Sequence, residues 1–275
     1  SRYGYVSTSS QPSQLHDKSL TVDEQLVFAS RYQDRQSFPS TSWGERIDVV
    51  YPYLAQGQES DDELRFSLRS LSNIHEDVNV WVTGDKPSWL NTQEAKHIAH
   101  ERVSDNPYID SMHAVKQALE HDDMGNHFIL MNDDLYILIP TAVAFLGIPR
   151  YFADYTDDLD SFKVVVKYHK LELGDLKALQ KRAMPMRNYG LHWPYVFNTD
   201  LFLNVYNEFG VDQNPHNMET LYYNSCSELV VPYPGDLLRS NKVVQEGFEL
   251  HQIPKNVVVL NNKEHGFSQI ESLLN

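Results

Sequence analysis

The chain has 275 residues, a formal net charge of −15 and a pI near 5.1. This length supports one large or two small domains with a sizeable core, and 41% hydrophobic with 22% charged residues excludes collagen-like, coiled-coil and wholly disordered classes. The acidic average repels phosphate polymers and anionic membranes, so any contact with nucleic acid must be local.

Cysteine content and hydropathy indicate a compartment. Cys226 is the single cysteine, which excludes an internal disulfide, and the sequence has no Asn-x-Ser/Thr sequon. No apolar run approaches the roughly 18 residues that a membrane-spanning helix needs. We therefore expect a cytoplasmic protein without a membrane span.

The first part of the chain predicts a tail and then a β-α-β unit. Residues 1–22 are rich in Ser, Gln and Tyr and predict a tail, which a short helix over 23–35 follows. The continuous apolar run 47–54 is typical of a buried parallel strand. Ser60 is a candidate N-cap for a helix with Leu64, Leu68, Leu71 and Ile74 at helical spacing, and 78–84 predicts the next strand.

The alternation continues over the next fifty residues. We expect a strand at 95–101, a helix over about 109–119 and a strand at 127–131. Strands alternating with helices predict an α/β fold with a mostly parallel sheet, which binds ligands beyond the carboxyl ends of its strands. After Pro140 the pattern predicts helices at 160–182 and 200–209 and a strand at 257–260, as an extension of the same domain.

The sharpest motif is Asn132-Asp133-Asp134, which directly follows the apolar run 128–131. Adjacent carboxylates at a strand end are tolerated when they face solvent, accept backbone hydrogen bonds or meet a cation. Mg²⁺ typically takes one or two protein carboxylates together with phosphate oxygens and water. The alternative interpretation is an ordinary turn stabilised by local Asn and Asp hydrogen bonds.

Four segments in order carry a family resemblance: Ile-Asp-Val-Val-Tyr at 47–51, Glu-Leu-Arg-Phe-Ser-Leu-Arg-Ser at 63–70, Pro-Ser-Trp-Leu-Asn at 87–91, and Phe-Ile-Leu-Met-Asn-Asp-Asp at 128–134. Together they resemble GT-A type glycosyltransferases, and more closely Stealth-type capsule phosphotransferases and related phage or bacterial glycosyltransferases. The resemblance implies a GT-A (nucleotide-diphospho-sugar transferase) fold. Residues 1–43 are then an N-terminal tail with a short helix, 44–140 the nucleotide-sugar half and 141–275 the acceptor half of one domain.

The resemblance also implies a metal ion, Mn²⁺ or Mg²⁺, that binds the diphosphate of a nucleotide sugar, with UDP as the expected nucleotide. Asn132, Asp133 and Asp134 occupy the family's acidic metal motif, with Asp133 and Asp134 as metal ligands and Asn132 and Asp133 also at the donor. His265, after the last predicted strand, is a candidate further metal ligand. No His-Glu-x-x-His or Cys/His spacing indicates zinc.

Several residues are candidates for binding the nucleotide. Tyr51 and Tyr53 follow the first strand, where the family places the base, and their alternative is core packing. Arg65 and Arg69 share a helix face and could reach the diphosphate, or they form exposed pairs with nearby acids. The residues that end the second strand, Asp85 and Lys86, could contact uracil or form a plain turn.

An inverting transfer needs a general base for the acceptor hydroxyl, and Glu219, His192 and Asp236 are the candidates, with Glu219 slightly favoured. His192 lies in an aromatic segment that could shape an acceptor pocket, or it is a hydrogen-bonded loop histidine. The acceptor is a glycan or, if the source is a phage, a hydroxylated DNA base. One basic cluster could follow a phosphate backbone or form a solvated helix face: Lys177, Lys181, Arg182 and Arg187.

Three functions remain open. The first is metal-dependent transfer of a sugar from a nucleotide diphosphate to a hydroxyl. The second is transfer of sugar 1-phosphate, which the Stealth-like segments favour, although residues 52–57 replace the acidic loop that follows the first strand in those proteins. The third is carbohydrate binding without catalysis, because a fold alone does not establish a function.

Overall fold

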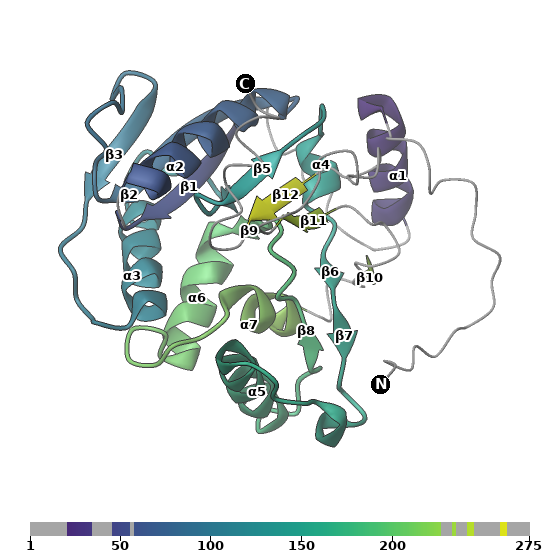
Figure 1. Ribbon diagram of the computed structural model, residues 1–275. Coiled ribbons are helices and arrows are strands. Elements are labelled where there is room, and N and C mark those ends of the chain that lie inside the picture. The colour runs from purple at the N-terminus through teal and green to yellow at the C-terminus, as the bar shows by residue number, and fades with distance from the viewer. Residues whose placement is uncertain are drawn as a thin grey trace.

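A computed structural model of the protein describes residues 21–34, 46–55, 58–226, 233–234, 241–244 and 259–262. The described part is an α/β fold around a five-stranded, mostly parallel sheet (Figure 1). The strand order is β3-β2-β1-β4-β9, with β1 paired in parallel to both β2 and β4, and with β9 antiparallel to β4. The bounds of these strands are β1 Arg46–Tyr53, β2 Asp77–Gly84, β3 Ala95–Ala99, β4 His127–Leu130 and β9 Val196–Asn198.

The four parallel strands confirm the strands predicted from the apolar runs, with ends that differ by one or two residues. The fifth, β9, was not predicted, because its three residues are too short to show a periodicity. It joins the sheet through the pairs His127↔Asn198, Phe128↔Phe197 and Ile129↔Val196. This strand therefore places the aromatic segment before it next to the end of β4.

Helices cover both faces of the sheet (Figure 1). Helix α3 (Pro107–Leu119) packs on β1 and β2 and also contacts α6 (Thr199–Phe209), whereas α2 (Gln58–Ser70) packs on β5 (Leu135–Ile137). Helix α2 begins at Gln58, so the prediction of Ser60 as its N-cap is wrong; Gln58 and Glu59 are good helix formers that start the helix earlier. The helices are α1 Val22–Asp34, α2 Gln58–Ser70, α3 Pro107–Leu119, α4 Val143–Leu146, α5 Lys167–Gln180, α6 Thr199–Phe209 and α7 Met218–Ser225, with single 3-10 turns at Leu71–Asn73 and Leu159–Ser161.

Small sheets extend the second half of the chain. β12 pairs antiparallel with β5 and parallel with β11, β10 pairs in parallel with β6, and β7 pairs antiparallel with β8. The predicted last strand at 257–260 corresponds to β12. Their bounds are β5 Leu135–Ile137, β6 Arg150–Tyr151, β7 Ala153–Asp154, β8 Arg187–Asn188, β10 Tyr233–Pro234, β11 Asn241–Val244 and β12 Val259–Asn262.

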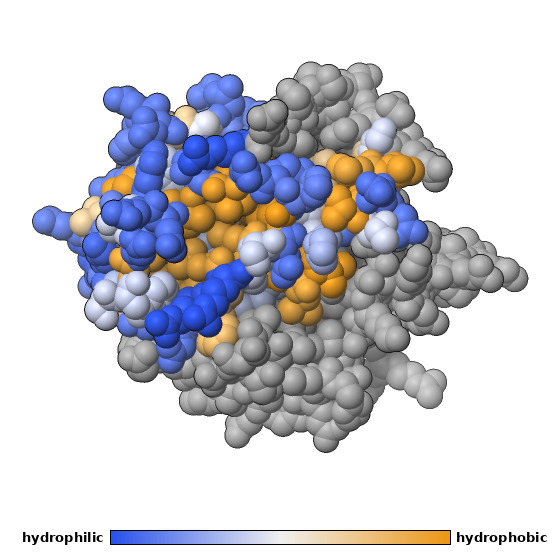
Figure 2. Space-filling model, turned by 90° about the horizontal axis from the view of Figure 1, so that it is seen from above, coloured by the Kyte–Doolittle hydropathy of each residue, from blue (hydrophilic) through white to orange (hydrophobic). Residues whose placement is uncertain are grey.

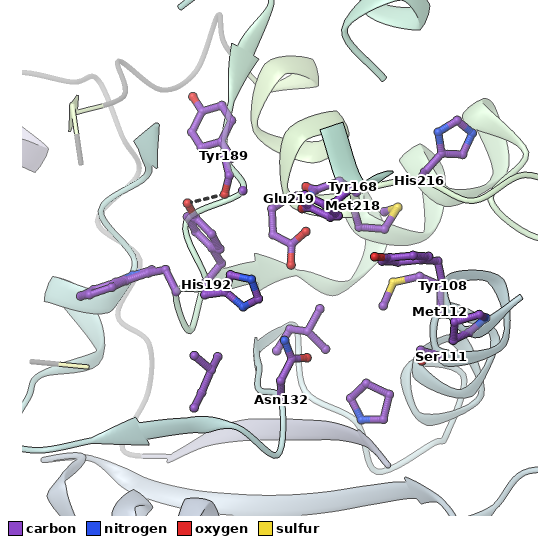
Figure 3. A pocket seen from close by; sticks show the side chains of 18 of the residues that line it. Tyr108, Ser111, Met112, Asn132, Tyr168, Tyr189, His192, His216, Met218 and Glu219 are labelled. Atoms are coloured by element: carbon purple, nitrogen blue, oxygen red, sulfur yellow. Dashed lines mark hydrogen bonds between the residues drawn. The ribbon is translucent and has the colours of Figure 1, made fainter. Parts of the chain in front are cut away.

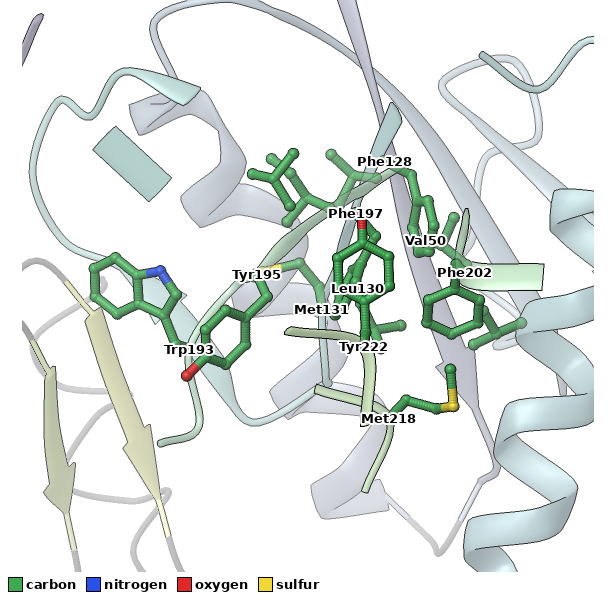
Figure 4. Close-up of a cluster of buried hydrophobic side chains, with 14 of the residues drawn as sticks. Val50, Phe128, Leu130, Met131, Trp193, Tyr195, Phe197, Phe202, Met218 and Tyr222 are labelled. Atoms are coloured by element: carbon green, nitrogen blue, oxygen red, sulfur yellow. The ribbon is translucent and has the colours of Figure 1, made fainter. Parts of the chain in front are cut away.

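An aromatic core joins the two halves of the fold (Figure 4). The ring of Phe197 on β9 stacks on Phe128 of β4 at 5.4 Å between centroids and meets Tyr222 of α7 edge-on at 4.8 Å. Phe202 of α6 packs against both phenylalanines at 5.2–5.3 Å. These buried rings fix α6 and α7 relative to the central sheet, because large aromatic contacts dominate core packing.

The N-terminal helix docks through a buried amide. The Gln25 side chain is 0% exposed, donates to the Pro140 carbonyl at 2.8 Å and accepts from the Ala142 backbone N–H at 2.9 Å.

Seen from above, hydrophobic residues form a band flanked by hydrophilic side chains (Figure 2). Among the residues that the structure describes, no helix has both the length and the apolar character to cross a bilayer.

Candidate functional site

A cavity of about 760 Å³ opens at the carboxyl ends of β1 and β4. Pro52 and Leu54 at the end of β1 line it, together with Leu130, Asn132 and Asp133 at the end of β4. Strand β1 lies between β2 and β4. After β1 the chain continues on one side of this strand as β2 and β3, and it later returns on the other side as β4. This is the switch point at which open parallel sheets form a ligand-binding crevice.

The turn after β4 is held from below by α2. The Ser67 hydroxyl donates to the Leu135 carbonyl at 2.5 Å and lies 3.3 Å from the Asn132 carbonyl, and the Leu135 N–H donates to the same Asn132 carbonyl at 3.2 Å. These backbone contacts turn the chain tightly between β4 and β5. They present Asn132 and Asp133 to the cavity.

The two adjacent acids face different surroundings. Asp133 lines the cavity, whereas Asp134 is half-buried outside the cavity wall and near Glu63 of α2. Burial, followed by the charge of Glu63, raises the pKa of Asp134 to about 7. Of the two carboxylates predicted to bind one ion, Asp133 thus lines the crevice and Asp134 is not among its described lining residues.

The segment between β8 and β9 forms the wall above this turn. Tyr189, Gly190, His192, Trp193 and Tyr195 line the cavity. His192 is exposed and has a positive φ of 44°, a conformation that is uncommon for residues other than glycine. The buried Trp193 indole and Tyr195 hydroxyl donate to the carbonyls of Leu146 and Arg150 at 3.0 and 2.7 Å. These anchors hold the loop while His192 projects toward the cavity (Figure 3).

Glu219 reaches the cavity from the first turn of α7, opposite Asn132 and beside His192 (Figure 3). Asn217 caps this helix by accepting from the Thr220 N–H at 2.9 Å. The fully buried Asp175 accepts from the Asn217 N–H at 2.8 Å and bonds His216 Nδ1 at 2.6 Å. A network of side chains from α5 thus sets where Glu219 lies.

Burial raises the pKa of the Glu219 carboxyl; nearby Asp175 raises it further, while its own backbone N–H and the charge of His192 lower it. Burial likewise raises the pKa of Glu172, whose carboxylate accepts from Asn188 Nδ2 at 2.9 Å. A carboxyl with a raised pKa is suited to exchange protons near neutral pH. Glu219 is the one of the two that lines the cavity.

Other predicted nucleotide contacts lie away from the cavity. Tyr51 and Tyr53 are each 1% exposed, and their hydroxyls bond Ser67 and Asp61 on the α2 side of β1. Side chains alternate along a strand, so Pro52 between them is the residue that faces the cavity. Their position corresponds to the core-packing alternative, and no ring face is offered to a base.

The charged candidates for the donor also lie outside the cavity lining. Arg65 and Arg69 are exposed, and their guanidinium groups lie 5.3 Å from the rings of Trp89 and Phe66. Both occupy the helix side opposite Ser67, which faces the β4–β5 turn. Their exposure agrees with the alternative interpretation, whereas the pairs with nearby acids that it included stay a prediction.

The end of β2 serves the backbone in this structure. The Asp85 carboxylate accepts from the Ala55 N–H at 2.8 Å and so ties the β1 loop to β2, whereas Lys86 is exposed. This arrangement corresponds to the turn alternative. Asp236 and His265 lie outside the described residues, and so their predicted roles stay predictions.

The sequence reasoning missed the far wall of the cavity. Tyr108 and Met112 come from α3, Tyr168 from α5, and Met218 from α7. Asn106 with Pro107 is a helix-start signal that could have placed Tyr108 in a first turn near the strand ends. No local pattern indicates that α5 and α7 approach this wall, because their placement depends on hydrogen bonds across 41–49 residues.

The lining described for this cavity has no lysine or arginine, and its carboxylates are Asp133 and Glu219. The basic cluster lies elsewhere: Arg182 pairs with Glu208 at 3.4 Å, Arg187 pairs with Asp154 at 3.0 Å, and Lys177 and Lys181 are exposed. A bound diphosphate would therefore need a cation to offset its charge.

The oxygens of Asp133 and Asn132 fit Mg²⁺ or Mn²⁺, which also accept phosphate oxygens and water. No cluster of three or more His, Cys, Asp or Glu side chains suited to a metal occurs among the described residues. A cation here would consequently be held jointly by the protein and the phosphates.

Comparison with known proteins adds no family to this description. No family model matches the chain, and no curated protein matches it either. The functional argument therefore depends on the geometry and chemistry of the cavity.

Proposed function

We propose that the protein is a GT-A type glycosyltransferase that moves a sugar from a nucleoside diphosphate sugar, with UDP as the first candidate, to a hydroxyl of a glycan or of a hydroxylated nucleic-acid base. One observation carries the proposal: the switch-point cavity brings Asn132 and Asp133 at the end of β4 opposite Glu219 of α7. An acid for a cation and a second acid for proton transfer are the two groups that such a transfer needs.

Asn132 and Asp133 would hold Mg²⁺ or Mn²⁺ at the diphosphate. When bound, the cation would supply charge neutralisation for the leaving diphosphate. Among the described residues that line the cavity, no lysine or arginine is present to do so. Trp193 and Tyr195, both buried and hydrogen-bonded to backbone carbonyls, would hold the loop against the substrate and help exclude water.

Glu219 is the proposed general base. Its carboxylate would accept the proton of the acceptor hydroxyl as the hydroxyl oxygen forms a bond to the sugar C1, while the bond from C1 to the diphosphate oxygen breaks and its electron pair leaves with the diphosphate. Burial raises the pKa of this carboxyl, which brings it closer to neutral pH, where general bases are most effective. His192 lies beside Glu219 and is the alternative base (Figure 3).

The proposal is tested by a thermal-shift screen of UDP-, GDP- and dTDP-sugars with Mn²⁺ and with EDTA. A ligand that binds only the native state raises the melting temperature. At a ligand concentration one hundred times its Kd, the free energy of unfolding rises by about 2.7 kcal/mol. We expect at least one nucleotide sugar to stabilise the protein in Mn²⁺ and not in EDTA. No stabilisation by any nucleotide would instead favour a carbohydrate-binding protein without catalysis.

Product analysis then separates the two transfer reactions. Release of UDP from a UDP-sugar identifies glycosyl transfer, whereas release of UMP identifies sugar 1-phosphate transfer. We expect UDP, because residues 52–57 lack the acidic loop of the phosphotransferases. UMP as the sole product would overturn the proposed reaction while retaining the proposed donor.

A further inference from the structure

The cavity continues past Glu219 to a second end that the donor chemistry does not use. We call it the aromatic end, and it is formed by Tyr108, Met112, Tyr168 and Met218. In Figure 3 the side chains of Tyr108, Met112 and Met218 gather on the side of the cavity away from His192. Three helices, α3, α5 and α7, supply these side chains.

Tyr108 is an exposed residue whose backbone is fixed by a helix cap. The capping side chain of Asn106 accepts from the Tyr108 N–H at 3.0 Å and fixes the first turn of α3, yet the residue remains 44% exposed. Its ring lies 6.3 Å from that of Tyr168 at an angle of 33°. The Tyr168 hydroxyl accepts from Asn217 Nδ2 at 2.5 Å, so the second ring is fixed by the network that also places Glu219.

The chemistry of this end suits the ring of a sugar. A pyranose presents apolar C–H groups on its faces and hydroxyls on its rim, and tyrosine offers a matching apolar ring with a polar tip. Methionine adapts to irregular apolar shapes, so Met112 and Met218 can follow the remaining surface. Apolar walls with a few polar groups that fix orientation are typical of small-molecule sites.

The charge of the site selects against anionic acceptors. Asp133 and Glu219 line the cavity without a lysine or arginine among the described lining residues, and Glu172 and Asp175 are buried close behind Tyr168 and Asn217. Proteins that bind nucleic acid neutralise phosphates with basic side chains. In this chain the pairs Arg182–Glu208 and Arg187–Asp154 lie on other surfaces.

We propose that the aromatic end is the acceptor subsite, that it stacks an uncharged sugar ring on Tyr108, and that it thereby directs an acceptor hydroxyl to Glu219. This inference rests on the proposed glycosyl transfer and narrows its acceptor to a neutral glycan. The same charge argument disfavours a hydroxylated DNA base, because of its flanking phosphates.

The test uses the full chain with Mn²⁺ and the donor found in the thermal-shift screen. The acceptor probes are methyl glucoside, methyl galactoside, methyl N-acetylglucosaminide and the trisaccharides maltotriose and cellotriose, with a hydroxymethylcytosine oligonucleotide as the anionic comparison. Nucleotide release is measured for each, and saturation-transfer NMR reports binding of the sugars without turnover. We expect at least one neutral sugar to bind and to accelerate release, and the oligonucleotide to do neither.

Variants locate the subsite. Tyr108→Ala should lower kcat/KM for the active sugar about three- to tenfold, the range expected for one aromatic contact, and should leave the Kd of the donor unchanged. Tyr108→Trp should retain acceptor use because it keeps a stacking face. Phe152→Ala is the matched control, because Phe152 is an aromatic residue 62% exposed that does not line the cavity.

The outcomes separate the two proposals. If no donor binds the wild-type protein, the proposed function fails and the acceptor inference fails with it. If the donor binds but only the oligonucleotide accelerates release, or no neutral sugar gives a saturation-transfer signal, the acceptor inference alone is overturned. If Tyr108→Ala weakened donor binding as much as it lowers kcat/KM for the acceptor, the ring would instead stack on the nucleotide base.

Discussion

The two walls of the cavity are built by different means. The lower wall consists of strand ends. The parallel pairing of β1 with β4 places Pro52 beside Asn132 and Asp133, because each of these residues directly follows the paired part of its strand. The upper wall consists of helices α5 and α7 and the loop before β9, which side-chain hydrogen bonds hold together across 16–49 residues of sequence. Backbone ladders tolerate side-chain replacement, whereas a polar network loses its geometry when one buried member is removed.

This difference predicts where substitutions act. Changes in the lower wall should alter ligand binding and leave the fold intact, because its polar side chains, Asn132 and Asp133, are exposed or half-buried and contribute little to packing. Changes in the network of the upper wall should alter both stability and turnover. The following variants test that division, in order of decreasing expected effect.

Glu219→Gln should have the largest effect. Removal of a general base typically lowers kcat 10²–10⁴-fold, and the amide preserves the shape of the side chain, so donor binding should change little. Steady-state kinetics and calorimetry with the donor measure the two quantities. Glu208→Gln is the control, because Glu208 is an exposed acid paired with Arg182; comparable loss of kcat in both variants would contradict the role of Glu219.

Asp175→Ala tests the network that supports the upper wall. It leaves His216 Nδ1 and the Asn217 N–H without their acceptor, and a buried group left unpaired costs about 1–3 kcal/mol. Urea unfolding should show this loss together with reduced kcat. Asp154→Ala removes exposed contacts, an ion pair with Arg187 and two hydrogen bonds from Thr156, and should cost less than Asp175→Ala. Similar destabilisation of the two variants would contradict the claim that the buried network stabilises the protein more than surface contacts do.

Asp134→Asn tests the acid that lies behind the lower wall. The pKa of Asp134 is about 7 in the folded protein, against an ordinary value of 3.8 for an aspartate side chain. The folded state therefore binds the proton more tightly than the unfolded state does. Stability therefore falls as pH rises from about 4 to 7. The amide cannot ionise, and we expect the variant to gain about 1–3 kcal/mol over wild type at pH 8 and less at pH 5.

The measurement is urea unfolding in EDTA at both pH values, with Asp157→Asn as an exposed control. A gain that does not depend on pH would show that Asp134 is not protonated more readily in the folded state. A loss of stability at pH 8 would show that its charged form is stabilised by a neighbour, and both results would remove the distinction between Asp133 and Asp134.

The sequence predicted the strand side of the site and not the helical side, for a physical reason. Continuous apolar runs identify buried parallel strands, and a polar pair directly after such a run must lie at the sheet edge, so Asn132 and Asp133 could be placed. Tyr51 was assigned the wrong face because the pleat direction depends on packing against α2, which the run does not encode. Glu219 was favoured because it lies in the family-like helix entry 214–219. Tyr108 had only the helix-start signal of Asn106 and Pro107, and Asp175 gave no local signal.

The central claim is tested most directly by calorimetry of the nucleotide-sugar donor in Mn²⁺ with three proteins: wild type, Asp133→Asn and Asp134→Asn. The structure places one of these neighbouring acids in the cavity and the other outside its wall. We predict that Asp133→Asn weakens donor binding at least about tenfold, the loss of one charge-assisted contact, and that Asp134→Asn binds as wild type does. Equal affinity in Asp133→Asn, or loss confined to Asp134→Asn, would contradict the account.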